Sequence, residues 1–398
     1  MDVSGRSPLP PPTRRSDPFH PPEGFAALRQ GPPVRVRLPS GRDAWLVSRY
    51  ADARAVLADP RFSADDSHPE FPRRSARPAT SGGLSFLRMD DPDHGRLRRM
   101  LTSEFTVRRI TAMRPGILRV VTGLLDELER GSPPVDLVER FALPLPSLVI
   151  CRLLGVPYED HAFFQSRSMT ILSTSVAPER AAAGFAELAA YLDRLVAARE
   201  REPTDDLLGR LAARHVATGA LGRAELVAIA RLLLIAGHET TANMLALSVL
   251  TLLRHPAQLA ALRADPSLIR PAVEELLRFL SVVQNGVFRV TREPVEVGGA
   301  RLEAGEGVVV ALPSANRDAG HYRDPDTLDI RRPNGHHLAF GHGAHQCLGQ
   351  TLARVELEIA LTELLARFPA LDLAAPLEDL RFRDDITVYG VYALPVRW

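Results

Sequence analysis

The sequence predicts a fold that is mainly α with small β-sheets. Its longest regular pattern, residues 223–254, is largely apolar and stops before Pro256. At ~1.5 Å per residue this pattern predicts a buried helix of about 48 Å, long enough to cross the whole molecule. Residues 107–211 also follow helical periodicity, whereas residues 35–38 and 44–47 alternate between apolar and polar side chains, which indicates a β-hairpin.

The chain begins with a proline-rich segment. Residues 1–22 combine seven prolines with polar groups, which predicts a flexible or polyproline-like lead. Residues 23–398 contain neither a recognisable linker nor an internal repeat. We therefore predict a single large domain over residues 23–398.

Composition excludes several classes of protein. The 398 residues are 45% hydrophobic and 24% charged with a net charge of +1, so nothing demands a nucleic-acid or anionic membrane partner. Two cysteines argue against a disulfide framework and suit a reducing cytoplasm. No run of about 18 or more apolar residues is present, and the N-terminus lacks the apolar core of a signal peptide. We expect a cytoplasmic protein with no membrane partner.

The glycine-rich stretch 340–349 contains Cys347, one of the two cysteines. Glycine lets a backbone turn sharply and approach a flat group closely. A helical apolar pattern resumes after Gly349, so Cys347 is predicted at a loop-to-helix junction. There the first backbone N–H groups of the helix would stabilise a thiolate.

This stretch resembles the haem-binding loop of cytochromes P450, Phe-x-x-Gly-x-x-x-Cys-x-Gly, with Phe340, Gly343, Cys347 and Gly349 at its fixed positions. The resemblance implies a cytochrome P450 fold with haem b between the long central helix and this loop, and with Cys347 as the metal ligand. A thiolate ligand favours cleavage of the O–O bond. The resemblance also implies that Phe340 and Gly349 lie at the haem and that His345 reaches a propionate.

Two other interpretations of this stretch remain open. Cys347 would also suit a buried structural cysteine, which behaves as a small apolar residue. A zinc site is the second possibility, although the spacing does not match the usual ligand pairs. Its candidate ligands are His336, His337, His342, His345 and Cys347.

A polar interruption divides the long apolar pattern at residues 236–241. Small residues beside a hydroxyl suit a local opening of the helical hydrogen bonds, and a buried acid beside an alcohol is costly unless it is used. The segment resembles the P450 oxygen-activation motif Ala/Gly-Gly-x-Asp/Glu-Thr. The resemblance implies that Glu239 and Thr240 deliver protons and that Ala236 and Gly237 lie at the haem. The alternative is a kinked core helix with a back-bonded threonine.

Three further basic residues are candidates for the haem propionates. His94 and Arg98 are spaced i, i+4 and share one face of a predicted helix. P450s carry a His-x-x-x-Arg pair here that binds propionates, and Arg289 matches the propionate-binding arginine on a strand. A solvated basic face, or a solvent-facing strand arginine, is the alternative for each.

A Glu-x-x-Arg pair, Glu275 and Arg278, lies on one predicted helical face. In P450s this pair is buried and is joined by an arginine from a later segment, for which we assign Arg332, with Arg331 as the alternative. A buried ionic network is tolerated only when it is fully hydrogen-bonded, so this group is predicted to be structural.

The resemblance to P450s implies a substrate pocket formed by four separated stretches. They are the irregular region 62–89, the central helix, the segment 283–285 and a C-terminal β-hairpin over residues 386–392. Most of the candidates are apolar, while the amide of Gln284, with that of Asn285, is expected to hold a carbonyl or hydroxyl group. The candidates are Phe86, Leu87, Leu234, Val283, Gln284 and Val388.

The resemblance implies a haem-thiolate monooxygenase that hydroxylates or epoxidises a bulky apolar small molecule with O2. The cysteine loop and residues 390–392 look like those of actinomycete P450s that act on macrolides, other polyketides or xenobiotics. A macrolide or polyketide is our first expectation, and a terpenoid or steroid-like compound is the second. A P450 oxidase without oxygen insertion and a non-enzymatic haem binder are alternatives, and neither would need the intact Glu239-Thr240 pair.

Electrons are expected from outside the chain. Gly341-x-Gly343 is followed by Gln346 rather than glycine, so it is not a dinucleotide fingerprint. The resemblance therefore implies a ferredoxin and a ferredoxin reductase as partners of a monomer. A basic docking face is expected to include Arg96, Arg99 and Arg108.

Overall fold

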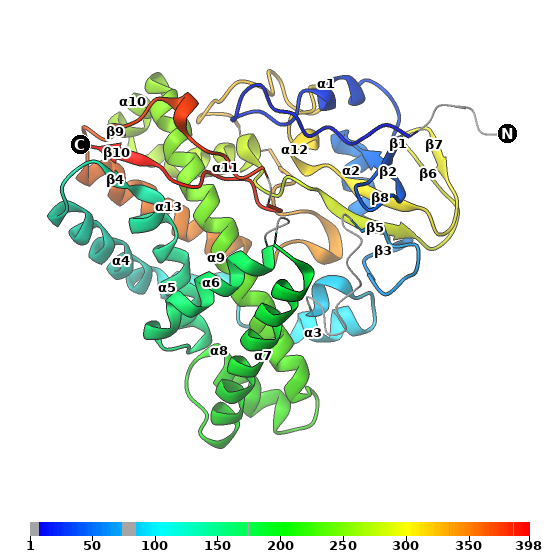
Figure 1. Ribbon diagram of the computed structural model, residues 1–398, viewed down its shortest axis with the longest axis horizontal. Helices are drawn as coiled ribbons and strands as arrows, with labels where there is room; N and C mark the ends of the chain where they lie inside the picture. Colours follow the sequence, from blue (N-terminus) through cyan, green and yellow to red (C-terminus); the bar gives the residue numbers. More distant parts are fainter. Residues whose placement is uncertain (1–7, 74–84, 173–175, 334, 385) are drawn as a thin grey trace.

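The structure is a computed structural model that describes residues 8–73, 85–172, 176–333, 335–384 and 386–398. Helices fill the left and lower parts of Figure 1, and most strands gather on the right beside the first two helices. This mainly helical arrangement with small sheets is the predicted fold class. The helices of the described part are α1 (Gly24–Leu28), α2 (Tyr50–Ala58), α3 (Asp93–Thr102), α4 (Val107–Arg130), α5 (Pro144–Leu154), α6 (His161–Leu172), α7 (Pro178–Arg201), α8 (Leu207–Leu211), α9 (Arg223–Arg254), α10 (Pro256–Ala264), α11 (Ile269–Leu280), α12 (Leu312–Ala315) and α13 (Gln350–Arg367).

The central element is α9, which crosses the molecule in Figure 1 and contacts α5, α7, α11 and α13. It begins after Gly222, whose N–H donates to the Glu225 carboxylate at 2.8 Å, and it ends before Pro256. The predicted opening at residues 236–241 does not interrupt it, because α9 is one continuous α-helix. The Thr240 hydroxyl donates to the carbonyl of Ala236 at 2.7 Å, so the alcohol is back-bonded within an intact helix.

By length and composition, α9 alone among the described helices would suit a membrane span. Its most apolar window is 83% buried inside the protein. A helix that is apolar all round and surrounded by other helices is the core helix expected from the sequence.

A five-stranded sheet carries one of the predicted site residues. Its order is β1-β2-β8-β5-β3, with β2 parallel to β8 and the other neighbours antiparallel. The hairpin expected at residues 35–47 is the β1–β2 pair. The strands are β1 (Val34–Arg37), β2 (Asp43–Val47), β3 (Phe62–Ser63), β5 (Val287–Thr291) and β8 (Gly307–Val310).

Two smaller sheets complete the described β-structure. They are β4-β10-β9 and the hairpin β6–β7, formed by β4 (Val135–Asp136), β6 (Val295–Val297), β7 (Ala300–Leu302), β9 (Asp372–Leu373) and β10 (Pro395–Arg397). The hairpin predicted over residues 386–392 is not present as paired strands. The chain does turn back here, but residues 390–392 pair antiparallel with residues 381–383 through an isolated bridge between Val391 and Phe382, and Val388 is bridged to Val283.

Residues 8–22 of the proline-rich segment contact the body of the protein, and residues 1–7 lie outside the described part. Phe19 is buried in the main core, and its carbonyl accepts a hydrogen bond from Arg317 at 3.0 Å. The guanidinium of Arg15 lies 3.9 Å from the centroid of the Tyr389 ring. Apolar anchors and a buried arginine outweigh the proline-rich composition, so this segment packs against the body of the protein.

Candidate active site

Cys347 lies between the short 3₁₀ turn η6 (Gly343–His345) and α13, where a loop-to-helix junction was predicted. Its N–H donates to the carbonyl of Phe340 at 2.9 Å, which closes the loop. Gly343 has a φ of 73°, and a Cβ there would lie 2.3 Å from the carbonyl oxygen of Leu57 in α2. Only glycine allows this approach, so the loop is held tightly against α2.

The electrostatic surroundings of Cys347 act in opposite directions. Burial raises the pKa of its thiol, whereas N–H groups of Gly349 and Gln350 and the charges of Arg98 and Arg354 lower it. By surface area, however, the Cys347 side chain is exposed. Protein surrounds the thiol, so burial is the largest influence on its pKa, while part of the side chain keeps accessible surface.

Four basic side chains gather beside the loop. Arg98 of α3 donates to the carbonyl of Gln346 at 2.5 Å, and the rings of His94 and His345 stack with their centroids 4.0 Å apart. Arg289 of β5 is 4% exposed and donates to the carbonyl of Phe288 at 2.8 Å. Burial and the charges of Arg289, His94 and Arg98 lower the pKa of His345 to about 3.

Few negative groups balance these cations in the described residues. Asp90 is already bound to Ser63, the N–H of Ala64 and Arg292. Asp91 lies 3.5 Å from Nδ1 of His94, but Nε2 of that ring is buried without a hydrogen-bond partner. Burial and the nearby charge of Arg88 lower the pKa of Arg289 to about 10. This excess of positive charge and unused hydrogen-bonding capacity suits a group with more than one carboxylate.

The polar segment of α9 combines an exposed alanine with a buried acid. Ala236 is exposed and Thr240 is half-buried, although both lie within a helix that is otherwise largely buried. Glu239 is 1% exposed. The helix therefore has one open patch of small and hydroxyl side chains, beside a carboxylate that is enclosed.

Glu239 belongs to a buried network that includes Arg383. Its Oε2 accepts hydrogen bonds from Arg383 Nη1 at 3.1 Å and from Asn243 Nδ2 at 3.3 Å, and Nε2 of His238 lies 3.2 Å from its Oε1. Burial opposes ionisation of Glu239, but the proximity and charges of His238 and Arg383 outweigh it and lower the pKa. Sequence reasoning missed Arg383, because nothing in residues 381–384 indicates burial. Asn243, four residues after Glu239 on the same helical face, was the available sign of a buried polar network around the acid.

The Glu-x-x-Arg group forms a fully hydrogen-bonded cluster. Glu275 accepts from Arg278 at 2.7 and 2.8 Å, from Arg332 at 3.1 Å and from the N–H of Asp329 at 3.0 Å. Arg332, rather than the exposed Arg331, is the third member. The remaining donors of both arginines reach backbone carbonyls, so this buried charge is compensated.

A second ionic group ties α11 to the cysteine loop. Arg354 binds Glu274 at 2.6 and 3.0 Å, and its guanidinium lies 4.6 Å from the centroid of the Phe340 ring. Burial opposes the ionisation of Glu274, but hydrogen bonds from His337 and Arg354 lower its pKa to about 2. The sequence showed no sign of this group, because its members are about 63 and 80 residues apart.

Comparison with known proteins identifies the family. A cytochrome P450 family model matches residues 185–375. Cytochrome P450-SU2 of Streptomyces griseolus is 52% identical over 384 residues, which are 96% of this chain and 94% of that protein. The chain belongs to the cytochrome P450 family.

Two further relatives of this P450 carry names that describe an activity. Vitamin D3 dihydroxylase of Streptomyces griseolus is 50% identical over 391 residues, 97% of this chain and 96% of that protein. The structure of mycinamicin VIII C21 methyl hydroxylase MycCI from Micromonospora griseorubida, bound to mycinamicin VIII, is similar with a TM-score of 0.93. It is 43% identical, and the match covers 98% of this chain and 100% of that chain.

This P450 is accordingly a monooxygenase, and its cofactor is haem, which the family binds through a cysteine thiolate to iron. The described residues fit such a group. The side chain of Cys347 has accessible surface, His94 has an unpartnered ring nitrogen, and Ala236 is exposed in the middle of a core helix. The other cysteine, Cys151, is 1% exposed in α5, and burial raises the pKa of its thiol to about 12.

The zinc interpretation is wrong for the described residues of this P450. They contain no cluster of three His, Cys, Asp or Glu side chains that could hold a metal ion. The histidines of the loop have other partners, because His337 contacts Glu274, His342 contacts Arg54 and His345 stacks on His94.

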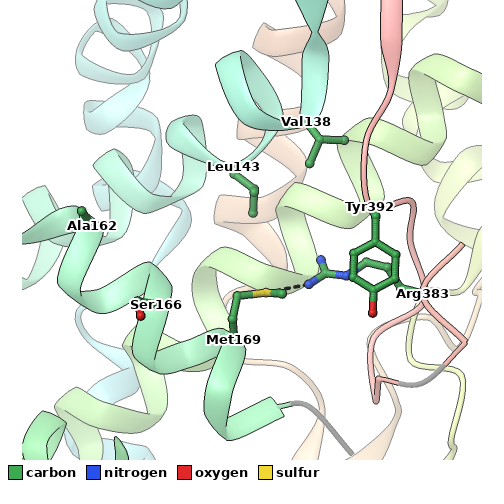
Figure 2. A pocket seen from close by; sticks show the side chains of 7 residues that line it. All are labelled: Val138, Leu143, Ala162, Ser166, Met169, Arg383 and Tyr392. Carbon is green, nitrogen blue, oxygen red and sulfur yellow. Dashed lines mark hydrogen bonds between the residues drawn. The ribbon is translucent and has the colours of Figure 1, made fainter. Parts of the chain in front are cut away.

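The predicted pocket residues are dispersed. Phe86 and Leu234 are buried, Leu87 is 37% exposed, and Val283 is bridged to Val388. The prediction for Gln284 needs correction, because its amide nitrogen donates to the carbonyls of Arg383 and Ile386 at 3.0 and 2.6 Å. Residues 74–84 of the predicted pocket region lie outside the described part. None of the six candidates lines the cavity in Figure 2.

The predicted basic face is divided. Arg96 is paired with Glu225 and donates to the carbonyl of Ala220 at 3.0 Å, whereas Arg99 and Arg108 are exposed. Arg96 and Arg99 border a surface cleft of about 480 Å³ that also includes Arg214. The cleft is basic, but Arg108 does not line it.

Proposed function

We propose that this P450 hydroxylates a bulky, mainly apolar natural product of the macrolide or polyketide class. The observation that carries oxygen insertion, as opposed to a simple oxidase or a haem carrier, is the pairing of the buried acid Glu239 with the half-buried alcohol Thr240 on α9. The macrolide-type substrate is supported by MycCI, whose structure holds mycinamicin VIII. Vitamin D3 dihydroxylase, at 50% identity, favours a steroid-like compound as the second candidate.

We assign the haem ligands from the chemistry of the donor set. Cys347 would bind the iron, with Phe340 and Gly349 beside it, and Ala236 and Gly237 would leave room on the opposite side. Bound haem supplies the activation of dioxygen and the insertion of one oxygen atom into a C–H bond. The propionates would be held by His94, Arg98, Arg289 and His345, whose excess positive charge they would neutralise.

Protons are the contribution of α9. The hydroxyl proton of Thr240, directed at the Ala236 carbonyl at 2.7 Å, can be redirected by rotation about one side-chain bond. Glu239 is held as a carboxylate by its basic neighbours, so it can take a proton from water and pass it on. The pair thereby supplies acid inside a site from which bulk water is largely excluded.

Substrate would be held mostly by apolar contact. Phe86, Leu87, Leu234, Val283 and Val388 remain the proposed pocket residues. The amide of Gln284 is removed from the proposed polar anchors, because it is bound to the C-terminal segment. Its neighbour Asn285 has a buried Nδ2 without a hydrogen-bond partner, which suits a substrate carbonyl or hydroxyl oxygen.

We propose a ferredoxin and its reductase as the electron source, and a cytoplasmic monomer as the working form. The exposed Arg99 and Arg108 are the candidates for contact with an acidic ferredoxin. Contacts between exposed charges change association rate and salt dependence more than final affinity. Charge reversal at either residue should therefore slow reduction at low salt and have less effect at high salt.

The test of the assignment uses spectra first and turnover second. The reduced protein with carbon monoxide should show a strongly red-shifted Soret band, and Cys347→His should lose it while retaining some haem. Macrolides and steroid-like compounds are then compared by the spin-state shift that they cause and by products that have gained one oxygen atom. A full red shift in Cys347→His would refute the ligand assignment, and hydroxylation of steroid-like compounds alone would refute the macrolide class.

A further inference from the structure

A cavity of about 350 Å³ lies between α6, the turn η2 (Val138–Ala142) and the C-terminal segment (Figure 2). Most of its lining is apolar, and its charged member is Arg383. Figure 2 shows the Arg383 side chain between Met169 of α6 and the ring of Tyr392. The cavity thus connects the α6 surface with a residue that binds Glu239.

Arg383 has more donors than the described residues can satisfy. It is 3% exposed and carries five N–H donors. Nη1 serves Glu239 and Asn243, Nη2 reaches the sulfur of Met169, and Nε has no partner among the described residues. A thioether is a weak acceptor, and a buried N–H without a partner is costly. The cavity is large enough for water, and the unused donors of Arg383 would bind it there.

Two hydrogen bonds hold the backbone of Arg383 in place. Its N–H donates to the carbonyl of Gly390 at 2.9 Å, and its carbonyl accepts from Gln284 at 3.0 Å. Gly390 itself lies against α9, because a Cβ there would lie 1.8 Å from Oδ1 of Asn243. The C-terminal segment is therefore pressed against the helix at the level of Glu239.

We propose that this cavity is the water-filled port through which protons reach Glu239, and that Arg383 is the positioning residue that orients the Glu239 carboxylate at its inner end. The proposal deepens the function proposed above and rests on Glu239 as the proton relay. Water bound to the unused donors of Arg383 would lie next to the carboxylate that Arg383 holds. An excess proton from bulk solvent would enter this water as hydronium and pass to the Glu239 carboxylate, which leaves neutral water behind.

The charged and titratable groups described next to Glu239 are His238, on its own helix, and Arg383, on the C-terminal segment. Both lower the pKa of the buried carboxyl. Removing the charge of Arg383 leaves His238 as the remaining basic neighbour that opposes burial, so the pKa of the Glu239 carboxyl should rise. Arg383→Met should therefore shift the titration of Glu239 to higher pH.

The first measurement needs no turnover. In the haem-loaded, substrate-free protein, the carboxylic-acid infrared band of Glu239, identified by its absence from Glu239→Gln, should persist to higher pH in Arg383→Met than in the wild type. Arg381→Met is the matched control, because Arg381 is exposed and lies over Tyr392 at 5.5 Å rather than beside Glu239. An unshifted titration of this band in Arg383→Met would overturn the positioning role.

The second measurement follows the port itself. Arg383→Met should lower product formed per electron about tenfold, a part of the usual contribution of general acid catalysis, and should introduce a new titration in its pH profile. Arg383→Lys should recover part of the loss, because a lysine keeps the charge but not the planar set of donors. Ser166→Leu, which places an apolar side chain in the cavity, should raise the solvent isotope effect without the infrared change. An unchanged isotope effect there would refute the port.

Glu239→Gln separates this inference from the proposed function. If that variant leaves product per electron unchanged, the relay itself is wrong. If Glu239→Gln is impaired while Arg383→Met is normal, the relay stands and the role of Arg383 is refuted. Should Arg383→Met fail to bind haem, Arg383→Gln, which also removes the charge, replaces it in both measurements.

Discussion

We predict that Arg289 destabilises the haem-free protein and binds the cofactor when haem is present. Burial and the nearby Arg88 lower its pKa from 12.5 to about 10, and the side chain is only 4% exposed. A difference of this size corresponds to about 3 kcal/mol against the charged form. Because the folded-state pKa is the lower one, the cost is fully present below pH ~10 and disappears only as the pH rises above it.

Arg289→Met should therefore stabilise the apoprotein and weaken its hold on haem. The variant also loses the hydrogen bond to the Phe288 carbonyl, which cancels about 1 kcal/mol of this stabilisation. The net gain in the free energy of unfolding is then about 1–3 kcal/mol. A chain of 398 residues has an unfolding entropy of about 0.8 kcal/mol/K, so the apoprotein should melt about 1–4 °C higher. Loss of a charged hydrogen bond to a propionate, worth about 1.5–3 kcal/mol, should weaken haem binding roughly 10- to 150-fold.

Two assays check the predicted rise in apoprotein stability and the predicted loss of haem affinity. Circular dichroism follows melting of the apoprotein, and the rate of haem transfer to excess apomyoglobin reports retention. Arg301→Met is the control, because Arg301 is 75% exposed in a surface pair and should change neither quantity. An apoprotein that melts lower, or a haem transfer rate equal to that of the wild type, would contradict the propionate assignment. A purely structural arginine would lower apoprotein stability instead.

Three other predictions concern the helix and the ionic groups. Thr240→Ala should keep the red-shifted spectrum but divert most electrons to hydrogen peroxide, measured as peroxide per electron consumed; tight coupling would be contrary to the relay. Glu275→Gln leaves Arg278 buried without its carboxylate and should cost about 3–5 kcal/mol in denaturant unfolding, whereas an effect below about 1 kcal/mol would mean that the cluster is dispensable. The folded protein lowers the pKa of Glu274 to about 2, so the ionised carboxylate stabilises the fold at pH values above the ordinary pKa of a glutamate. This stabilisation is lost as the pH falls toward about 2. In Glu274→Gln the free energy of unfolding should depend less on pH across that acid range. A pH dependence equal to that of the wild type would contradict this.

Local patterns were enough for the elements that carry the chemistry. The bounds of α9 follow from an uninterrupted apolar pattern followed by Pro256, and the loop before α13 follows from closely spaced glycines around Cys347. In each case neighbouring residues determine the structure, because helix periodicity and glycine conformations act within a few residues. The motif spacing likewise indicates the family without the tertiary structure.

Long-range packing decided what the local patterns left open. A hydrogen bond from Arg317 to the carbonyl of Phe19 holds the proline-rich segment 8–22 against the body of the protein. In the segment 386–392, Val388 is bridged to Val283 and Val391 to Phe382. Neither outcome has a local cause. Composition describes what a segment prefers in isolation, whereas burial against distant partners determines what it does in the folded protein.

The sequence by itself determined the fold class, the cysteine loop and the acid–alcohol pair on the central helix. Only the tertiary structure decided that Arg383 reaches Glu239, that Gln284 is bound to the C-terminal segment, and that a cluster of cations faces too few acids. The physical reason is that charge and hydrogen-bond partners are set by distance in space. Arg383 and Glu239 are 144 residues apart along the chain, yet their atoms lie 3.1 Å apart in the fold.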